Sequence, residues 1–305
     1  MENKNFLHYL FIGLKGMAMG VAEIVPGVSG GTIAFISGIY EELITSINNV
    51  NISLFKTLQK NGFKAFWTQL NGNFLATLFL GMLVSIFSFS KLIHWLMENE
   101  HVPLWAFFFG LVLGSVIFVG KSIQKWNAKI ITTLILGACI AFYITTLPPS
   151  ENVDSLAFLF FSGAIAICAM ILPGISGAYI LVLLGSYSTI LESVHERNFK
   201  VIITVALGAI FGLLSFSKLL KWMFSKHKDI TLALLTGFIL GSLNKIWPWK
   251  VILETKAFGD KIKVIKDQSI SPYAFEGDNQ LFLAITVAIV GFSLIFILEK
   301  VASKK

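Results

Sequence analysis

Charged residues are scarce in this sequence: only 13% of its 305 residues are charged, whereas 55% are hydrophobic. A soluble domain of this length carries far more charge on its surface, so the composition excludes that class. The mean hydropathy of +0.78 instead predicts a chain that crosses a lipid bilayer several times. The net charge of +7 is therefore assigned to loop lysines that face anionic lipid headgroups, and not to a nucleic-acid-binding surface.

Cysteine is nearly absent as well. The two cysteines, Cys139 and Cys168, lie in separate apolar segments, which favours two small packed side chains over a disulfide. The sequence has no Cys/His spacing typical of a metal site. Neither a metal nor a soluble cofactor is expected.

What the chain does contain is a repeated break within apolar sequence. Pro26-Gly27-Val28-Ser29-Gly30 recurs as Pro173-Gly174-Ile175-Ser176-Gly177. Aligning residues 16–40 with 163–187 gives ten identities in 25 positions, and aligning 81–115 with 208–242 gives twelve in 35. These matches indicate an internal duplication. Two broken apolar segments, one in each half of a chain, are typical of the binding site of a transporter.

Each half therefore predicts a broken, re-entrant helical hairpin followed by three transmembrane helices, which makes the fold class an all-α polytopic membrane protein. The first repeat, residues 1–150, comprises hairpin 6–47 and helices at about 74–97, 104–120 and 130–147. The second repeat, residues 151–305, comprises hairpin 156–194 and helices at about 200–223, 230–247 and 280–299. Segment 48–73 is interpreted as a polar connector, and segment 250–279 as a long loop.

Loop charge predicts the orientation in the membrane. Lysines cluster at 56–64, 121–129, 221–228 and 300–305, which places these loops and both termini in the cytoplasm. The outer loops carry the acidic residues Glu98, Glu100, Glu151 and Asp154. The assignment is consistent only if each hairpin returns to the side from which it entered. The two repeats are then inverted relative to each other, an arrangement that suits alternating access.

The residues around each Pro-Gly pair are candidates for anion binding. Pro26-Gly27 and Pro173-Gly174 are expected to end the first half-helix of each hairpin, and a serine then caps the second half-helix. A helix N-terminus presents free N–H donors and partial positive charge, which suits a phosphate or a carboxylate. The candidate substrate-binding residues of the two hairpins are Ser29, Gly30, Gly31, Thr32, Ser176 and Gly177. The alternative is a tight hairpin whose serine cap has only a structural role.

Glu23 is the one acidic residue in the part of the first hairpin that precedes the Pro26-Gly27 break, and it is the candidate coupling-ion site. A charged carboxyl group at this depth costs roughly 2.5 kcal/mol or more. It would also repel an anionic ligand, so we expect Glu23 to be protonated or paired with a cation when substrate is bound. This predicts coupling to a proton or sodium gradient. The alternative is a structural partner for Lys15.

Lys91 and Lys218 occupy equivalent positions in the repeat, which makes them candidates for binding an anionic headgroup. Snorkelling to the membrane interface is the alternative for lysines near the ends of apolar segments. Two glycine pairs, Gly110/Gly114 and Gly237/Gly241, predict close helix packing without a chemical role.

Two stretches resemble the polyprenyl-phosphate transporter family, a prokaryotic membrane family with paired Pro-Gly-x-Ser-Gly hairpins that was long known only as a domain of unknown function. They are Gly20–Thr32 with Gly38–Glu41, and Cys168–Gly177 with Gly185–Tyr187. The resemblance covers nearly the whole chain. It implies a flippase, not an enzyme, that returns the lipid undecaprenyl phosphate from the outer to the cytoplasmic leaflet of the inner membrane. That lipid is the carrier reused in the synthesis of cell wall and surface glycans.

Two other functions remain open on the residues alone. One is a secondary transporter of a small soluble anion, which shares the need for helix N-termini and lysines. The other is an intramembrane serine hydrolase, because Gly27-x-Ser29-x-Gly31 matches a nucleophile motif. That chemistry needs a histidine base within the membrane, and only His94 lies in a suitable segment, toward its end.

Overall fold

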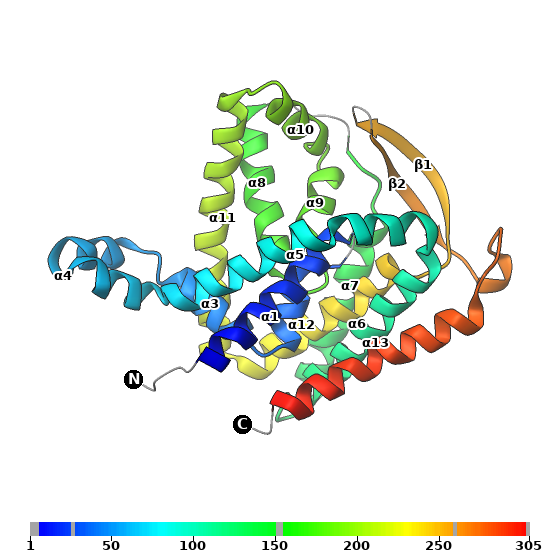
Figure 1. Cartoon of the computed structure of the whole chain (residues 1–305), viewed down its shortest axis with the longest axis horizontal. Coiled ribbons are helices and arrows are strands. Elements are labelled where there is room, and N and C mark those ends of the chain that lie inside the picture. The colour runs from blue at the N-terminus through cyan, green and yellow to red at the C-terminus, as the bar shows by residue number, and fades with distance from the viewer. Residues whose placement is uncertain (1–5, 26–27, 151–154, 259–260, 303–305) are drawn as a thin grey trace.

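The computed structural model describes residues 6–25, 28–150, 155–258 and 261–302 (Figure 1). Some residues named above from the sequence lie outside the described residues: Pro26, Gly27, Glu151, Asp154, Lys304 and Lys305.

Helices dominate the fold, which confirms the helical fold class. The first half contains α1 (Phe6–Ile24), α2 (Gly30–Ile36), α3 (Tyr40–Asn48), α4 (Ile52–Leu70), α5 (Gly72–Asn99), α6 (His101–Lys121) and α7 (Ala128–Thr146). The second half contains α8 (Leu156–Ile171), α9 (Gly177–Leu183), α10 (Tyr187–His195), α11 (Phe199–Lys226), α12 (Lys228–Ser242) and the 3-10 helix η1 (Leu243–Ile246). The strands β1 (Lys250–Phe258) and β2 (Lys261–Ser269), the 3-10 helix η2 (Pro272–Ala274) and α13 (Leu281–Ala302) complete it.

Six helices of the described chain are long and apolar enough to cross a membrane. They are α1, α5, α6, α7, α11 and α12 continued by η1. Helices α9 and α10 together form a further apolar segment that bends by 107° between them, as a broken or re-entrant span does. The apolar helices α8 and α13 are shorter in their described apolar parts. The protein is therefore a multi-pass membrane protein.

The long helices pack in pairs that follow the internal duplication. α1 packs along α5, and the equivalent helices α8 and α11 pack along each other (Figure 1). α6 of the first half packs along α13 of the second, and α12 packs along α7 in the same way. Such pairs, in which a helix of one half packs along a helix of the other, are expected when an approximate two-fold axis relates the two halves of a duplicated chain. We propose that this axis lies in the membrane plane, which would make the repeats inverted.

The glycine pairs predicted to mediate packing do lie at these helix contacts. A Cβ atom at Gly110 would overlap the backbone of Ala288 in α13, and one at Gly237 would overlap that of Leu134 in α7. The neighbouring Gly114 and Gly241 face the same partner helices. The absence of side chains at these positions lets the helix backbones approach closely.

Two segments differ from the sequence-based expectation. Segment 48–73, interpreted as a polar connector, contains a helix that was not predicted, α4, which is kinked at Gly62 (φ +77°). This helix has no counterpart in the second half, where α10 leads directly into α11. Segment 250–279 is not a plain loop, because β1 and β2 form an antiparallel hairpin. The Trp247 indole N–H donates to the Ile270 carbonyl just after β2, and the Trp249 indole N–H donates to the Asn279 carbonyl just before α13.

Candidate functional site

The second hairpin breaks where its proline predicts. α8 ends at Ile171, and Leu172 is extended (φ −65°, ψ 129°), as the residue before a proline should be. Gly174 has a φ of +90°, a conformation that favours glycine, and it lies directly against Phe238 and Ser242 of α12. In the first hairpin, α1 likewise ends at Ile24, two residues before the proline.

Ser29 is the N-cap of α2, as the sequence predicted. Its hydroxyl oxygen accepts a hydrogen bond from the Gly31 amide at 3.1 Å, and the residue is only 2% exposed. The same hydroxyl lies within 3.4 Å of the carbonyl oxygens of Met170 and Leu172, to which it donates. The cap of the first hairpin is therefore bonded to the end of α8 in the second.

Further contacts join the two breaks. The Gly174 amide donates to Thr32 Oγ1 at 2.9 Å, and the buried Tyr40 hydroxyl donates to the Ile171 carbonyl at 3.2 Å. A Cβ atom at Gly31 would lie only 2.6 Å from that carbonyl oxygen, so a larger residue there would push the hairpins apart. The polar backbone atoms that the second break leaves unpaired are thus satisfied by the first hairpin, as buried backbone requires.

Glu23 occupies the N-terminus of α2. Its Oε1 atom accepts a hydrogen bond from the Gly30 amide at 2.9 Å, and the side chain is half-buried. Lys15 binds elsewhere, because its amine donates to the Ser37 carbonyl at 2.6 Å. The described residues give no ion pair between Lys15 and Glu23, so the structural alternative for Glu23 is not supported.

The second hairpin repeats this geometry without the carboxylate. Ser176 is the N-cap residue of α9, but its side chain makes no capping hydrogen bond and is half-buried. Gly177 packs against Ala166 and Met170, and Met170 stands where the first hairpin has Glu23. The N-terminus of α9 therefore has neither the serine cap nor the acidic partner that α2 has.

The structure separates the two lysine candidates from the hairpin breaks. Lys91 is exposed on α5. Lys218 lines a pocket between α11 and the junction of α3 with α4, and no residue of either break lines that pocket. His94, one turn beyond Lys91, has its Nε2 atom 3.2 Å from Oε1 of Glu98 on the same helix.

The contacts that Ser29 makes with other described residues do not support a catalytic nucleophile. Its hydroxyl contacts one backbone amide and two backbone carbonyls, and no histidine bonds to it among the described residues. Within the same residues, no cluster of three or more His, Cys, Asp or Glu side chains could hold a metal ion.

Two residues were missed from the sequence, one at the hairpin breaks and one at the Lys218 pocket. Tyr40 is 2% exposed, and its ring packs against Phe224 of α11 while its hydroxyl binds α8. Its identity with Tyr187 in the aligned repeats was the available signal. Asn48 lines the Lys218 pocket and had no sequence signal beyond its position after the first hairpin.

Comparisons with known proteins agree with one another. A family model described as "VCA0040-like: Undecaprenyl phosphate translocase-like" matches residues 19–263. A relative from Vibrio cholerae serotype O1, named polyprenyl-phosphate transporter, is 42% identical over 304 residues, which is 98% of each chain. One from Staphylococcus aureus with the same name is 33% identical over 254 residues, 77% of this chain and 85% of the relative. No solved structure matches the chain.

Proposed function

Because this chain belongs to the VCA0040-like family, whose description is undecaprenyl phosphate translocase-like, we propose that it carries a polyprenyl phosphate across a membrane. The names of both relatives support a transporter over an enzyme. The proposed substrate is undecaprenyl phosphate, and the proposed direction is from the outer to the cytoplasmic leaflet, so that the lipid can be reused in the synthesis of cell wall and surface glycans.

The observation that carries this proposal is the direct contact between the two hairpin breaks. The Gly174 amide binds Thr32, and Ser29 binds the end of α8, so residues from both halves form one polar cluster within apolar helices. A phosphate headgroup could be held there by serine hydroxyls and backbone amides while its prenyl chain stays in the lipid. We place the headgroup between Ser29, Gly30, Gly31 and Thr32 on one side and Ser176 and Gly177 on the other.

Glu23 supplies a coupling mechanism in this proposal. Its carboxylate holds the Gly30 amide, which a phosphate would need at the start of α2. Two anions cannot share that position, so the arriving phosphate displaces the carboxylate, which takes up a proton or a cation as it leaves. The uptake of one cation per lipid would couple transport to a proton or sodium gradient.

The contacts between loops support the orientation that the loop charges predict. Asp229 accepts hydrogen bonds from the amides of Gln124 and Lys125, and Lys228 pairs with Glu41 at 2.8 Å, so lysine-rich loops lie together. Ser150, in a loop assigned to the outside, donates its amide to the Leu183 carbonyl at the end of α9 at 2.8 Å. We propose an inner-membrane protein whose two termini lie in the cytoplasm.

A flipping assay in proteoliposomes tests the function. A fluorescent short-chain polyprenyl phosphate is added, and the fraction shielded from a membrane-impermeant quencher is followed with time. Intact protein should move the lipid, whereas Glu23→Gln and the double variant Ser29→Ala/Ser176→Ala should move it more slowly. Ser225→Ala, which changes an exposed serine on α11 outside the site, is the matched control.

Uptake of radiolabelled inorganic phosphate in the same vesicles separates a lipid transporter from a transporter of soluble anions. Lipid movement without phosphate uptake supports the proposal. Phosphate uptake without lipid movement, from protein shown to be folded, would replace it with the soluble-anion alternative. A labelled phosphatidylcholine should stay in its leaflet, because its headgroup carries no net charge.

A further inference from the structure

A pocket of about 420 Å³ lies between the junction of α3 with α4 and the C-terminal half of α11. Its lining residues are Asn48, Val50, Asn51, Ile52, Ser53, Leu214 and Lys218. We call it the α3–α11 pocket. None of these residues belongs to the hairpin breaks, and none is acidic, so the pocket is separate from the site above and has a cationic lining.

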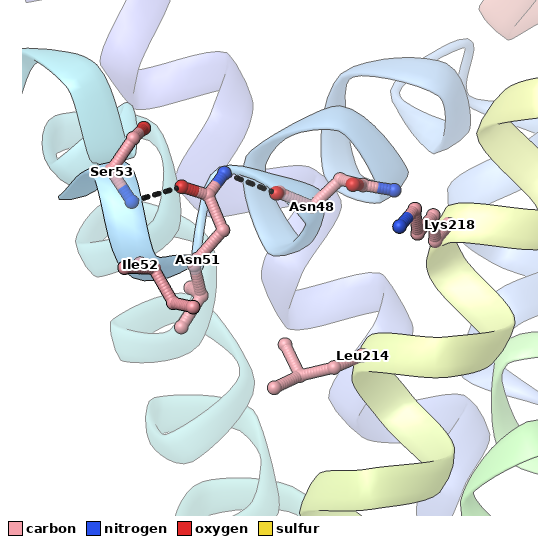
Figure 2. A pocket seen from close by; sticks show the side chains of 7 residues that line it. Asn48, Asn51, Ile52, Ser53, Leu214 and Lys218 are labelled. Atoms are coloured by element: carbon pink, nitrogen blue, oxygen red, sulfur yellow. Dashed lines mark hydrogen bonds between the residues drawn. The ribbon is translucent and has the colours of Figure 1, made fainter.

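The polar end of the pocket consists of Lys218 and Asn48. Figure 2 shows the Lys218 amine facing the side-chain amide of Asn48. The Asn48 amide nitrogen is buried and has no hydrogen-bond partner among the described residues. A buried donor that lacks an acceptor is costly, and a lysine amine beside it cannot supply one. An anion in the pocket can accept hydrogen bonds from both the Asn48 amide and the exposed Lys218 amine.

Asn51 fixes the position of this polar end. Its side-chain amide donates to the Asn48 carbonyl at 3.1 Å, and its side-chain oxygen accepts from the Ser53 amide at 2.9 Å (Figure 2). The first amides of α4 are therefore already capped by Asn51. The free donors in the pocket are the side chains of Lys218 and Asn48, not a helix N-terminus.

The remaining wall is apolar and continues into a lipid-facing surface. Ile52 and Leu214 line the pocket, and Ile52 is 76% exposed. Helix α11 presents further exposed apolar side chains, among them Phe211 and Leu219. Such a surface on a membrane-spanning helix faces acyl chains. A ligand that enters from the lipid could leave its chain along α11 and place its head at Lys218.

Helix α4 places the pocket at headgroup depth. Its exposed face combines apolar side chains such as Phe55 and Phe63 with Lys56, Lys60 and Lys64. A helix with this composition lies in the interface of a bilayer with its lysines at the lipid phosphates. The α3–α11 pocket opens where α4 begins, so lipid headgroups lie at its entrance.

We propose that the α3–α11 pocket binds the headgroup of a lipid phosphate monoester as a second subsite, on the face of the membrane where α4 lies. Lys218 and Asn48 donate to the phosphate oxygens, and the first units of the prenyl chain lie against Leu214 and Ile52. The proposal rests on the proposed function and adds a place where the transported lipid waits before or after the hairpin site. A free phosphate ion has no apolar part that could contact Leu214 and Ile52, so the lining favours a lipid phosphate over the free ion.

The pocket depends on how α3 packs. It exists because α3 packs along α11, where Tyr40 contacts Phe224 (ring centroids 5.9 Å apart). In the second half, α10 does not pack along α5 in this way among the described residues, although Lys91, like Lys218, is exposed. Alternating access would close α10 onto α5 and form the equivalent subsite around Lys91 on the opposite face.

Binding of farnesyl phosphate to the purified full chain tests the subsite. Lys218→Gln and Asn48→Asp should each weaken binding about tenfold, because a hydrogen bond to a charged group is lost and the aspartate adds a like charge. Lys218→Arg should bind nearly as intact protein does. Lys226→Gln, an exposed lysine two turns further along α11, is the matched control and should change binding by less than about twofold.

Two further probes identify what the pocket recognises. Farnesol, which lacks the phosphate, and inorganic phosphate, which lacks the chain, should both bind far more weakly than farnesyl phosphate. A farnesyl phosphate with a photoreactive chain should label the peptide that contains Leu214. Tight binding of inorganic phosphate, or labelling elsewhere only, would overturn the proposal of a lipid subsite.

The subsite and the function can fail separately. If intact protein flips the lipid but Lys218→Gln and Lys226→Gln weaken farnesyl phosphate binding equally, Lys218 acts only through surface charge and the subsite is wrong. If intact, folded protein neither flips nor binds the lipid, the proposed function fails and the subsite fails with it.

Discussion

The Glu23 carboxylate accepts a hydrogen bond from the Gly30 amide at 2.9 Å, so it holds the helix N-terminus that a transported phosphate would need. The equivalent pair in the second hairpin is Met170 and Gly177, and a methionine cannot play this part. The two hairpins are therefore alike in backbone and different in chemistry. The first hairpin carries an acidic group that a ligand would have to displace. The second hairpin has no such group at the N-terminus of its second half-helix.

Replacing Glu23 by glutamine should remove the response of transport to a cation gradient. The Glu23→Gln side chain can still accept the Gly30 hydrogen bond, so the hairpin should fold, but it cannot take up a proton or pair with sodium. In proteoliposomes with an imposed proton or sodium gradient, intact protein should accelerate flipping and the variant should not. Glu192→Gln, which changes an exposed acidic residue of the second hairpin, is the control. An unchanged gradient response in Glu23→Gln would remove Glu23 from coupling.

The two hairpin serines should differ in their effect on stability. Ser29→Ala removes an N-cap and two hydrogen bonds to α8, so it should lower the free energy of unfolding by roughly 1 kcal/mol or more. Ser176→Ala removes no capping bond and should be nearly neutral. Thermal unfolding in detergent measures this difference.

Transport by the same two variants separates a binding role from a structural one. If both serines hold the headgroup, Ser176→Ala should slow flipping even though its stability is unchanged. Normal flipping by a stable Ser176→Ala protein would restrict the substrate contact to the first hairpin.

Much of the fold could be predicted because long apolar segments indicate membrane-spanning helices and Pro-Gly pairs indicate where helices end. The proline at 173 ends α8 within two residues of the expected position, and the serine at 29 caps α2. The helix at 52–70 was missed because its many lysines and polar residues obscure the apolar face of an amphipathic helix. The strands at 250–269 were missed because each strand is stabilised by pairing with the other and by the Trp247 contact at the base of the hairpin, and neither contact can be read from the sequence.

The site was harder to predict than the fold. Repeat identity pointed to Ser29 and Ser176 as equivalents, yet only Ser29 is bonded across to the other hairpin. The packing of the hairpins differs as well, because α3 packs along α11, whereas α10 does not pack along α5 among the described residues. A duplicated sequence cannot reveal which of its halves is closed. The sequence also did not indicate the hydrogen-bond partner of Glu23, because that partner is a backbone amide seven residues away.

Fixing α3 to the start of α12, and so in its position along α11, should stop transport. Glu41 on α3 and Lys228 at the start of α12 form an ion pair of 2.8 Å with half-exposed side chains. In a background with Cys139→Ala and Cys168→Ala, the double variant Glu41→Cys/Lys228→Cys can be joined by a short, reducible bis-thiol reagent. Flipping should be lost after cross-linking and should return on reduction. In alternating access the protein itself must change conformation to move the lipid, and the cross-link would prevent α3 from moving.

The single variants Glu41→Cys and Lys228→Cys, treated with the same reagent, show the effect of modification without a link. They should flip the lipid normally, because an exposed ion pair of this kind contributes little to stability. Full transport by the cross-linked double variant would show that α3 does not move during the cycle.

Asp267 should anchor the β-hairpin through charge. Its carboxylate lies 3.0 Å from the amines of both Lys245 and Lys250, and all three side chains are largely buried. Burial alone would raise the pKa of Asp267, but the two lysines outweigh it and hold that pKa below its ordinary value. Lys245 also lies 4.7 Å from the ring of Tyr179 in α9, so this cluster ties the strands to the second hairpin.

Asp267→Asn should therefore lower the free energy of unfolding by roughly 2 kcal/mol at neutral pH, because two buried ammonium groups lose their counter-charge. Since the folded-state pKa is lowered, the aspartate's contribution is present in full above its ordinary pKa of about 4 and is lost as the pH falls through the folded value. Thermal unfolding should thus separate the two proteins at pH 7 and bring them together in strong acid. Glu254→Gln, in a half-exposed pair with Lys266, should leave unfolding unchanged. Equal unfolding temperatures of Asp267→Asn and intact protein at pH 7 would show that the strands are held by their tryptophan contacts instead.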